Sequence, residues 1–356
     1  MSSVAEGKIG VVAVAKRARV STATVSRVLN GSSLVAAATR DRVLQVAEKV
    51  GYMPDPRFRF MGQNRSGCPH NTGNIGVLVR GLSQADLVAN PYYMRLFWSI
   101  EQTARRLQRH ILLSTLENET YLPDFVTDMK VDGVLFIDYV DPPLIQRVRK
   151  LMPAVMVNCL AEGSGISMLM ADEASGVRQG LQYLRSLGHQ KICYFDVHDS
   201  ESVNHQHAER AAAFASLTSQ LGMNQTQSVI LQKRLLPMNE TARLQLLQWR
   251  DSGWRPTAIL CGSDFYALGF LNAARELGID VPAQLSVIGA DDTEICEHAT
   301  PQLTSIRQPF EAMGASAVEI LGGLVDGDDV PQTTQRFDVT LVRRQSCAAC
   351  GGKKAY

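Results

Sequence analysis

The stretch with the clearest chemistry is residues 20–30, Val-Ser-Thr-Ala-Thr-Val-Ser-Arg-Val-Leu-Asn. Ser21 places a short oxygen side chain directly before a helical run, which is typical of an N-cap. Val25, Val28 and Leu29 recur at the spacing of one helix face. The opposite face carries small hydroxyl groups, an amide and an arginine, but no acid: Thr22, Ala23, Ser26, Arg27 and Asn30. Such a face fits the major groove of DNA, where small side chains permit close approach and arginine matches guanine or phosphate.

The flanking sequence favours a DNA-reading helix over an ordinary amphipathic surface helix, which is the other interpretation. An upstream apolar stripe predicts another short helix: Val11, Val14, Ala15 and Ala18. A tight turn at 18–20 then gives the helix-turn-helix layout, in which the second helix enters the groove. A third predicted helix, 39–50, supplies the missing core through its inner face: Val43, Leu44, Ala47 and Val50.

These segments resemble the headpiece of the LacI/GalR family of transcriptional repressors. The resemblance rests on residues 14–31, on Thr-Arg-Asp-Arg-Val at 39–43 and on Gly-Tyr-Met-Pro at 51–54. It implies that Thr22 and Ala23 read bases, with Arg27 as a third reader. Phosphate contacts are expected from Thr24, Ser26 and Asn30, although Ser26 could instead hydrogen bond within its own helix. Arg19 replaces the glycine usual in the turn, at a cost of about 1 kcal/mol if its backbone is left-handed.

The segment 52–74 is a linker rich in Pro, Gly, Asn and Ser in its second half. In the family, its first half forms a hinge helix that enters the minor groove. Met61 falls at the position of the wedging leucine, and Arg57 and Arg59 suit the adjacent phosphates. Pro56 and Phe58 depart from the family pattern, so an extended linker packed on the body is the alternative.

From Asn74 onward, short apolar strands alternate with amphipathic helices. Strands are expected at 75–79, 111–114, 133–137, 154–158, 191–195, 228–231, 257–261 and 285–288, and helices at 94–107, 174–187, 207–221, 240–250 and 264–277. This alternation predicts parallel sheets covered by helices. The predicted fold class is α/β: an N-terminal all-α helix-turn-helix headpiece (1–54), a hinge and linker (55–74), a bilobed periplasmic-binding-protein-like body of two parallel α/β subdomains (75–346) and a tail (347–356).

The resemblance continues to about residue 346 and implies an effector site in the cleft between the lobes, where strands end. Its candidate residues are Tyr92, Tyr93, Arg210, Asp264, Phe265 and Asp291. Either tyrosine could stack on a sugar face, or one could belong to the core. Arg210 suits hydroxyl pairs or a carboxylate, or else a surface ion pair with Glu209 or a neighbour. Asp264 could be only an N-cap.

The charge distribution and the cysteine content narrow the class of protein further. The first 66 residues contain eleven Lys and Arg against four Asp and Glu, whereas the whole chain has a net charge of only +1. A basic module on a mildly acidic body points to nucleic acid at one end. Seven scattered cysteines, with no signal peptide and no membrane-length apolar run, indicate a cytoplasmic protein.

Metal, cofactor and catalytic signals are expected to be absent. Cys347 and Cys350 form a lone pair, and His198, His205 and His207 have no acidic or cysteine partner at a recognisable spacing. We therefore predict no cofactor, no catalytic residue and no metal.

The expected protein is a repressor that binds near-palindromic double-stranded operator DNA as a homodimer, controlled by a small molecule such as a sugar. The alternatives are a solute-binding protein without a DNA role and an enzyme built on the same body.

Overall fold

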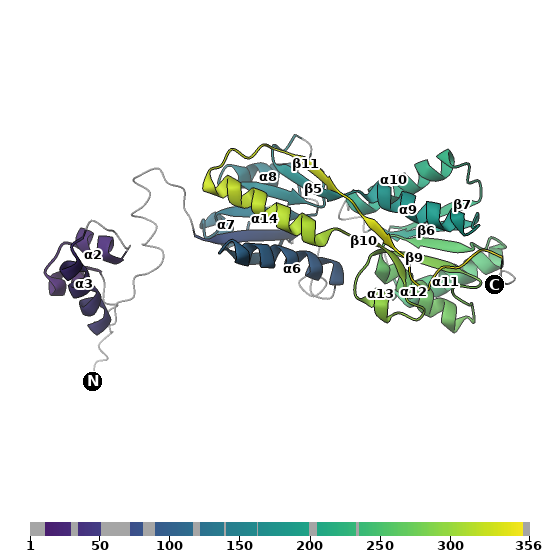
Figure 1. The fold of residues 1–356 in the computed structure, drawn as a ribbon, viewed down its shortest axis with the longest axis horizontal. Coiled ribbons are helices and arrows are strands. Elements are labelled where there is room, and N and C mark those ends of the chain that lie inside the picture. Colours follow the sequence, from purple (N-terminus) through teal and green to yellow (C-terminus); the bar gives the residue numbers. More distant parts are fainter. Residues whose placement is uncertain are drawn as a thin grey trace. The chain divides into compact units, whose positions relative to one another are not determined.

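A computed structural model describes residues 11–29, 35–50, 72–80, 90–116, 122–138, 140–161, 163–198, 205–232 and 235–351 (Figure 1). The chain divides into two compact units, Met1–Asn71 and Thr72–Tyr356, and each is described by itself. The predicted boundary at residue 54 falls outside the described residues. Within the described ranges, no helix is both long enough and apolar enough to cross a membrane.

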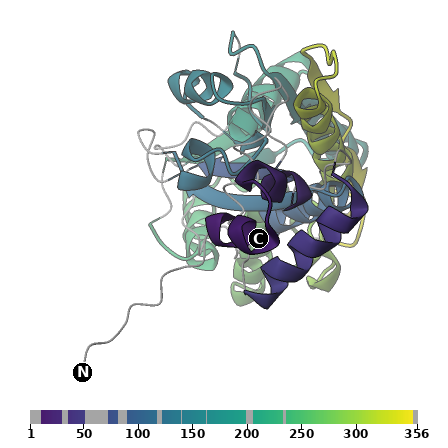
Figure 2. The same cartoon turned by 90° about the vertical axis from the view of Figure 1, so that its left-hand side faces the viewer.

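The first unit contains three short helices, α1 (Val11–Ala18), α2 (Thr22–Leu29) and α3 (Ala37–Lys49). They pack on one another (Figure 2). Their shared core consists of small and β-branched side chains: Val14, Ala15, Ala18, Val25, Val28, Val43 and Ala47. The prediction that Leu44 faces inward is wrong, because this side chain is 45% exposed. Leu44 lies one position, about 100°, around the helix from the buried Val43.

In the turn between α1 and α2, Arg19 adopts the left-handed backbone conformation that we expected to cost stability. Arg19 has φ 51°, in the left-handed region that glycine adopts without a steric penalty. The Ser21 side chain accepts a hydrogen bond from Thr24 N at 3.1 Å, so the predicted N-cap of α2 is confirmed. The turn therefore combines one strained residue with one stabilising cap.

The second unit has two lobes, each built on a six-stranded sheet. The first sheet has the order β11-β5-β4-β3-β1-β2 and is parallel throughout. Its strands are β1 (Asn74–Arg80), β2 (His110–Leu116), β3 (Gly133–Ile137), β4 (Ala154–Val157), β5 (Ser167–Ala171) and β11 (Thr334–Phe337). Its helices are α6 (Pro91–Arg106), α7 (Asp124–Thr127), α8 (Pro142–Arg149) and α14 (Phe310–Asp326).

The second sheet has the order β12-β10-β9-β8-β6-β7, with only the β10–β12 pair antiparallel. Its strands are β6 (Ile192–Val197), β7 (Thr226–Leu231), β8 (Ala258–Cys261), β9 (Ser286–Asp291), β10 (Thr304–Arg307) and β12 (Thr340–Val342). Its helices are α9 (Glu173–Ser186), α10 (His205–Gln220), α11 (Met238–Ser252), α12 (Asp264–Glu276) and α13 (Ile295–His298). The predicted fold class, a helix-turn-helix unit with a bilobed α/β body, is confirmed.

The chain crosses between the lobes three times. Short connections join β5 to α9, β10 to α14 and β11 to β12, and Figure 1 shows β11 leading from one sheet toward the other. One hydrophobic cluster runs through both lobes, from Ile75 and Phe310 to Tyr194 and Phe214. The strand ends that face this junction therefore bring polar residues from distant parts of the chain together.

Candidate functional sites

The exposed face of α2 retains the character predicted for a DNA-reading surface. Thr22, Ala23 and Arg27 are exposed, while Val25 and Val28 are buried beneath them. Thr24 lies close to the N-cap, with its hydroxyl 2.9 Å from the Ser21 hydroxyl.

Several predicted DNA contacts cannot be placed. Asn30, Arg57 and Met61 lie outside the described residues, and so does the side chain of Ser26. Base reading by Thr22, Ala23 and Arg27, and insertion of Met61 into the minor groove, therefore stay predictions.

Tyr92 and Tyr93 begin α6 and point their hydroxyl groups into the junction between the lobes. The Asn90 side chain caps this helix by accepting from Tyr92 N at 3.0 Å. The Tyr92 hydroxyl accepts hydrogen bonds from Asn158 Nδ2 at 2.5 Å and from Gln206 Nε2 at 2.9 Å. Asn158 belongs to the first lobe and Gln206 to the second. Tyr92 therefore links the two lobes through one hydroxyl group.

Both tyrosine rings are also part of the core. Tyr92 is 8% exposed and Tyr93 is 7% exposed, and their ring centroids lie 5.2 Å apart in an edge-to-face arrangement. The ring of Tyr92 also packs edge-on against Phe310 at 4.9 Å. These rings therefore offer little free face for stacking.

Arg210 lies in α10 and forms a buried ion pair, but not with its neighbour Glu209. Its Nε donates to Glu173 Oε2 at 2.6 Å, and its Nη1 donates to the Gly262 carbonyl oxygen. The Asp291 carboxylate lies 3.6 Å from Nη2. Glu209 pairs instead with Arg336 at 2.7 Å. Arg210 thus joins the start of α9 and the ends of β8 and β9.

Asp264 has a different place from the one expected. Ser263, and not Asp264, caps α12 by accepting from Tyr266 N at 3.3 Å. Asp264 is buried and accepts from the Ser305 hydroxyl at 2.5 Å and from Thr293 N at 2.7 Å. Its oxygens are thus engaged in joining α12 to the segments beside β9. Phe265, next along the helix, is 50% exposed and can contact a ligand.

Sequence reasoning missed five buried polar residues at this junction: Asp138, Asn158, Glu173, Gln206 and Gln308. Asp138 and Asn158 directly follow β3 and β4 and have positive φ values of 63° and 67°. A polar residue directly after an apolar strand was the available signal. Tyr93 donates to Asp138 Oδ2 at 2.5 Å, whereas Oδ1 of Asp138 and Oε1 of Gln308 are buried and have no hydrogen-bond partner among the described residues. Such groups are rare in native proteins and suit donors from a ligand.

The junction is rich in buried carboxylates. Burial raises the pKa of Asp138 to about 6, although the hydrogen bond from Tyr93 and the nearby His207 act in the opposite direction. Burial also raises the pKa of Asp264 to about 6. The pKa of Asp291 is raised well above its usual value by burial, against the lowering effect of Arg210.

The histidines in and beside α10 do have an acidic neighbour, so the expectation that they lack one is wrong. Asp196 lies next to both His198 and His207, and His205 is not part of this group. The sequence hid the contact because Asp196 is eleven positions from His207 and belongs to β6.

Comparison with known proteins agrees with this architecture. Residues 13–55 match the model of bacterial regulatory proteins of the lacI family, and residues 181–347 match a periplasmic binding protein-like domain. The transcriptional regulator MalR of Streptomyces coelicolor is 31% identical over 356 residues, covering 96% of this chain and 97% of its own length. The repressor CytR of Escherichia coli is 29% identical over 343 residues, covering 94% of this chain and 95% of its own length. The crystal structure of the lac repressor dimer bound to operator and the anti-inducer ONPF has a TM-score of 0.74 at 26% identity, covering 96% of this chain and 100% of that one.

A helix-turn-helix unit joined to a bilobed binding body defines a transcriptional regulator rather than an enzyme. The chain belongs to the lacI family of bacterial regulatory proteins.

Proposed function

We propose that this regulator is a repressor that binds near-palindromic operator DNA as a homodimer and responds to a small polyhydroxylated ligand, such as a sugar, between its lobes. In this proposal α2 reads the major groove, and the protein acts in the bacterial cytoplasm, where its DNA lies. The similarity to the operator-bound lac repressor dimer supports the DNA and dimer parts. A two-fold protein matches a two-fold operator.

The observation that carries the ligand response is the Tyr92 hydroxyl, which bonds Asn158 in one lobe and Gln206 in the other. A ligand that replaces either bond changes what holds the lobes in their present relation. Asp138 Oδ1 and Gln308 Oε1 supply free acceptors for its hydroxyl groups. Because these contacts differ between lobe arrangements, the ligand binds the arrangements unequally, which is the requirement for control.

A surface of α6 supports the homodimer. Met94 and Trp98 are 47% and 56% exposed, although both are large and apolar. They line a hollow of about 770 Å³ between α6 and the residues after β9. A hollow rimmed by charged groups with apolar side chains exposed in it is typical of a protein interface.

The test is binding of the full-length protein to DNA around its own gene at fixed salt, with and without a panel of sugars. We expect a protected palindrome whose occupancy changes with one sugar. The matched variant is Tyr92→Phe, which keeps the packed ring and removes the hydroxyl group. It should bind DNA like the parent protein and respond to the sugar with an altered midpoint. Absence of any specific site at low salt would contradict the proposal.

A further inference from the structure

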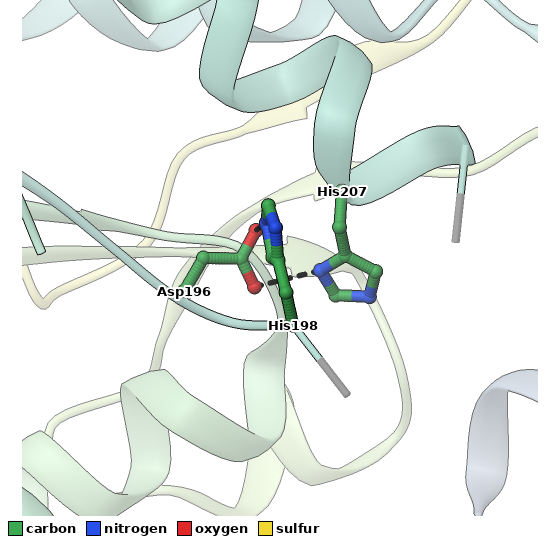
Figure 3. A group of neighbouring side chains, drawn as sticks. All are labelled: Asp196, His198 and His207. Atoms are coloured by element: carbon green, nitrogen blue, oxygen red, sulfur yellow. Dashed lines mark hydrogen bonds and ion pairs between the residues drawn. The ribbon is translucent and has the colours of Figure 1, made fainter. Parts of the chain in front are cut away.

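Three side chains outside the predicted effector set converge in the second lobe. Asp196 lies near the end of β6, His198 follows that strand, and His207 lies in the first turn of α10. Their candidate ligand atoms all lie within 4.8 Å of one another. Figure 3 shows the imidazole rings of His198 and His207 next to the Asp196 carboxylate. Among the described residues, no other group of three His, Cys, Asp or Glu side chains converges in this way.

We propose that Asp196, His198 and His207 form a site for a divalent transition metal such as Zn²⁺. Two imidazoles and one carboxylate are a common ligand set for zinc and related metals. Three protein ligands leave one position open, to be filled by water or by an oxygen or nitrogen of a small molecule. The inference goes beyond the proposed DNA role and does not depend on it.

The distances suit a metal after a small adjustment. His207 Nδ1 lies 2.6 Å from Asp196 Oδ1, and His198 Nε2 lies 3.5 Å from Asp196 Oδ2. Ligand atoms of a tetrahedral zinc ion lie about 3.3 Å apart, given bonds of about 2.0–2.1 Å. The carboxylate and His207 must therefore separate by about 0.7 Å, and the metal takes the place of the proton between them.

The carboxylate is held in place by groups that do not themselves reach the metal position. The Tyr194 hydroxyl donates to Asp196 Oδ2 at 2.5 Å, and Val197 N donates to Oδ1 at 2.8 Å. Gly262 makes room for it, because a Cβ there would lie 2.4 Å from the Asp196 carboxyl carbon. Such supporting contacts orient metal ligands in known sites.

The charge around the cluster also favours a cation. Asp138 and Asp291 lie close enough to interact electrostatically with His207 and Asp196 respectively. His198 Nε2 is buried without a well-aligned hydrogen bond. A metal ion would use this lone pair and offset the surrounding negative charge.

The test is zinc binding by the purified full-length protein after removal of metals, measured by competition with a chromophoric chelator. We expect one Zn²⁺ bound per chain at this site. Loss of a supporting residue typically weakens metal sites by about 10–100-fold. Loss of a direct ligand in Asp196→Asn, His198→Gln or His207→Gln should therefore weaken binding by about 100-fold or more.

The matched control is His205→Gln, which removes a histidine from the same turn of α10 but not from the cluster. It should bind zinc like the parent protein, and so should a Cys347→Ser, Cys350→Ser double variant. His198→Gln is the decisive variant, because its contact with the cluster is the longest and its fold should be unaffected. Circular dichroism checks this.

Cobalt provides a second readout that does not depend on affinity. The Co²⁺-loaded protein should show intense visible absorption typical of four or five ligands, and His198→Gln should lose it. Zinc binding that is unchanged in all three ligand variants, or no stoichiometric binding by the parent protein, would overturn the proposal. Because DNA is absent from these assays, this failure is distinct from failure of the repressor proposal.

Discussion

The two candidate sites of this protein are built in opposite ways. The face of α2 is exposed, and its residues lie within a single helix. The interlobe site is buried, and its polar groups come from the ends of several strands and from four helices, α6, α9, α10 and α12. An exposed site tolerates substitution at little cost in stability, whereas a buried polar network combines binding with folding. Changes in the two regions should therefore separate affinity from stability.

The largest effect is expected at Arg210. Arg210→Met leaves Glu173, 2% exposed, with only Gln308 as a hydrogen-bond donor among its side-chain contacts in the described structure. An uncompensated buried charge costs about 3–5 kcal/mol, so the body should unfold at markedly lower denaturant concentration. The control is Arg336→Met, which breaks a more exposed pair with Glu209 and should cost less than about 1 kcal/mol. Equal losses of unfolding free energy in the two variants would refute the distinction between the buried and the exposed ion pair.

A pH-dependent effect is expected at Asp138. Burial raises the pKa of this carboxyl from 3.8 to about 6. The unfolded chain therefore releases the proton first, and the native state loses stability as pH rises from about 4 to about 6. Asp138→Asn removes this contribution, so its stability relative to the parent protein should increase by up to about 3 kcal/mol across that window. Denaturant unfolding of both proteins at pH 4 and pH 7 measures this change. A difference in unfolding free energy between variant and parent that is the same at both pH values would contradict the raised pKa of Asp138.

An intermediate effect is expected at Arg27, on affinity alone. If Arg27 reads a base, Arg27→Ala should weaken binding to the specific site by about 1–3 kcal/mol and leave the unfolding of the body unchanged. If it contacts a phosphate, binding should weaken for all sequences and the salt dependence should fall by about one ion. Arg105→Ala, at an exposed position of α6, is the control and should change neither the affinity for DNA nor its salt dependence.

The smallest effect is expected at Arg19, where a substitution should improve the fold. Arg19→Gly relieves the left-handed backbone at φ 51° and should stabilise the helix-turn-helix unit by about 1 kcal/mol. Lys16→Gly, inside α1, should destabilise the unit by a similar amount, because glycine is unfavourable within a helix. Hydrogen exchange of the α1 and α2 amides in the full-length protein reports both. Effects of the same sign would show that the turn is not strained.

The sequence predicted those features that local patterns control. The stripes of α1 and α2, the Ser21 cap and most strands and helices of the body follow from periodicity and capping. The strands β5, β10, β11 and β12 were not predicted, because short strands carry little periodicity and because β11 and β12 lie far along the chain from the strands β5 and β10 with which they pair. The arginine in α10 was found from its resemblance to the family, yet its partner Glu173 was not, because 37 residues separate them. Asp196 was missed because it lies eleven positions from His207. Asp138 and Asn158 were missed although each directly follows an apolar strand.

The three short crossings between the lobes have a mechanical consequence. Two bodies joined at two points can turn about the line through those points, and a third tether removes most of the remaining freedom. Gln308 in one crossing donates to Glu173, which follows another, so the tethers are also coupled to each other. The two lobes should then move relative to each other mainly along one low-energy hinge motion. A ligand bound between the lobes can therefore act only on that single movement.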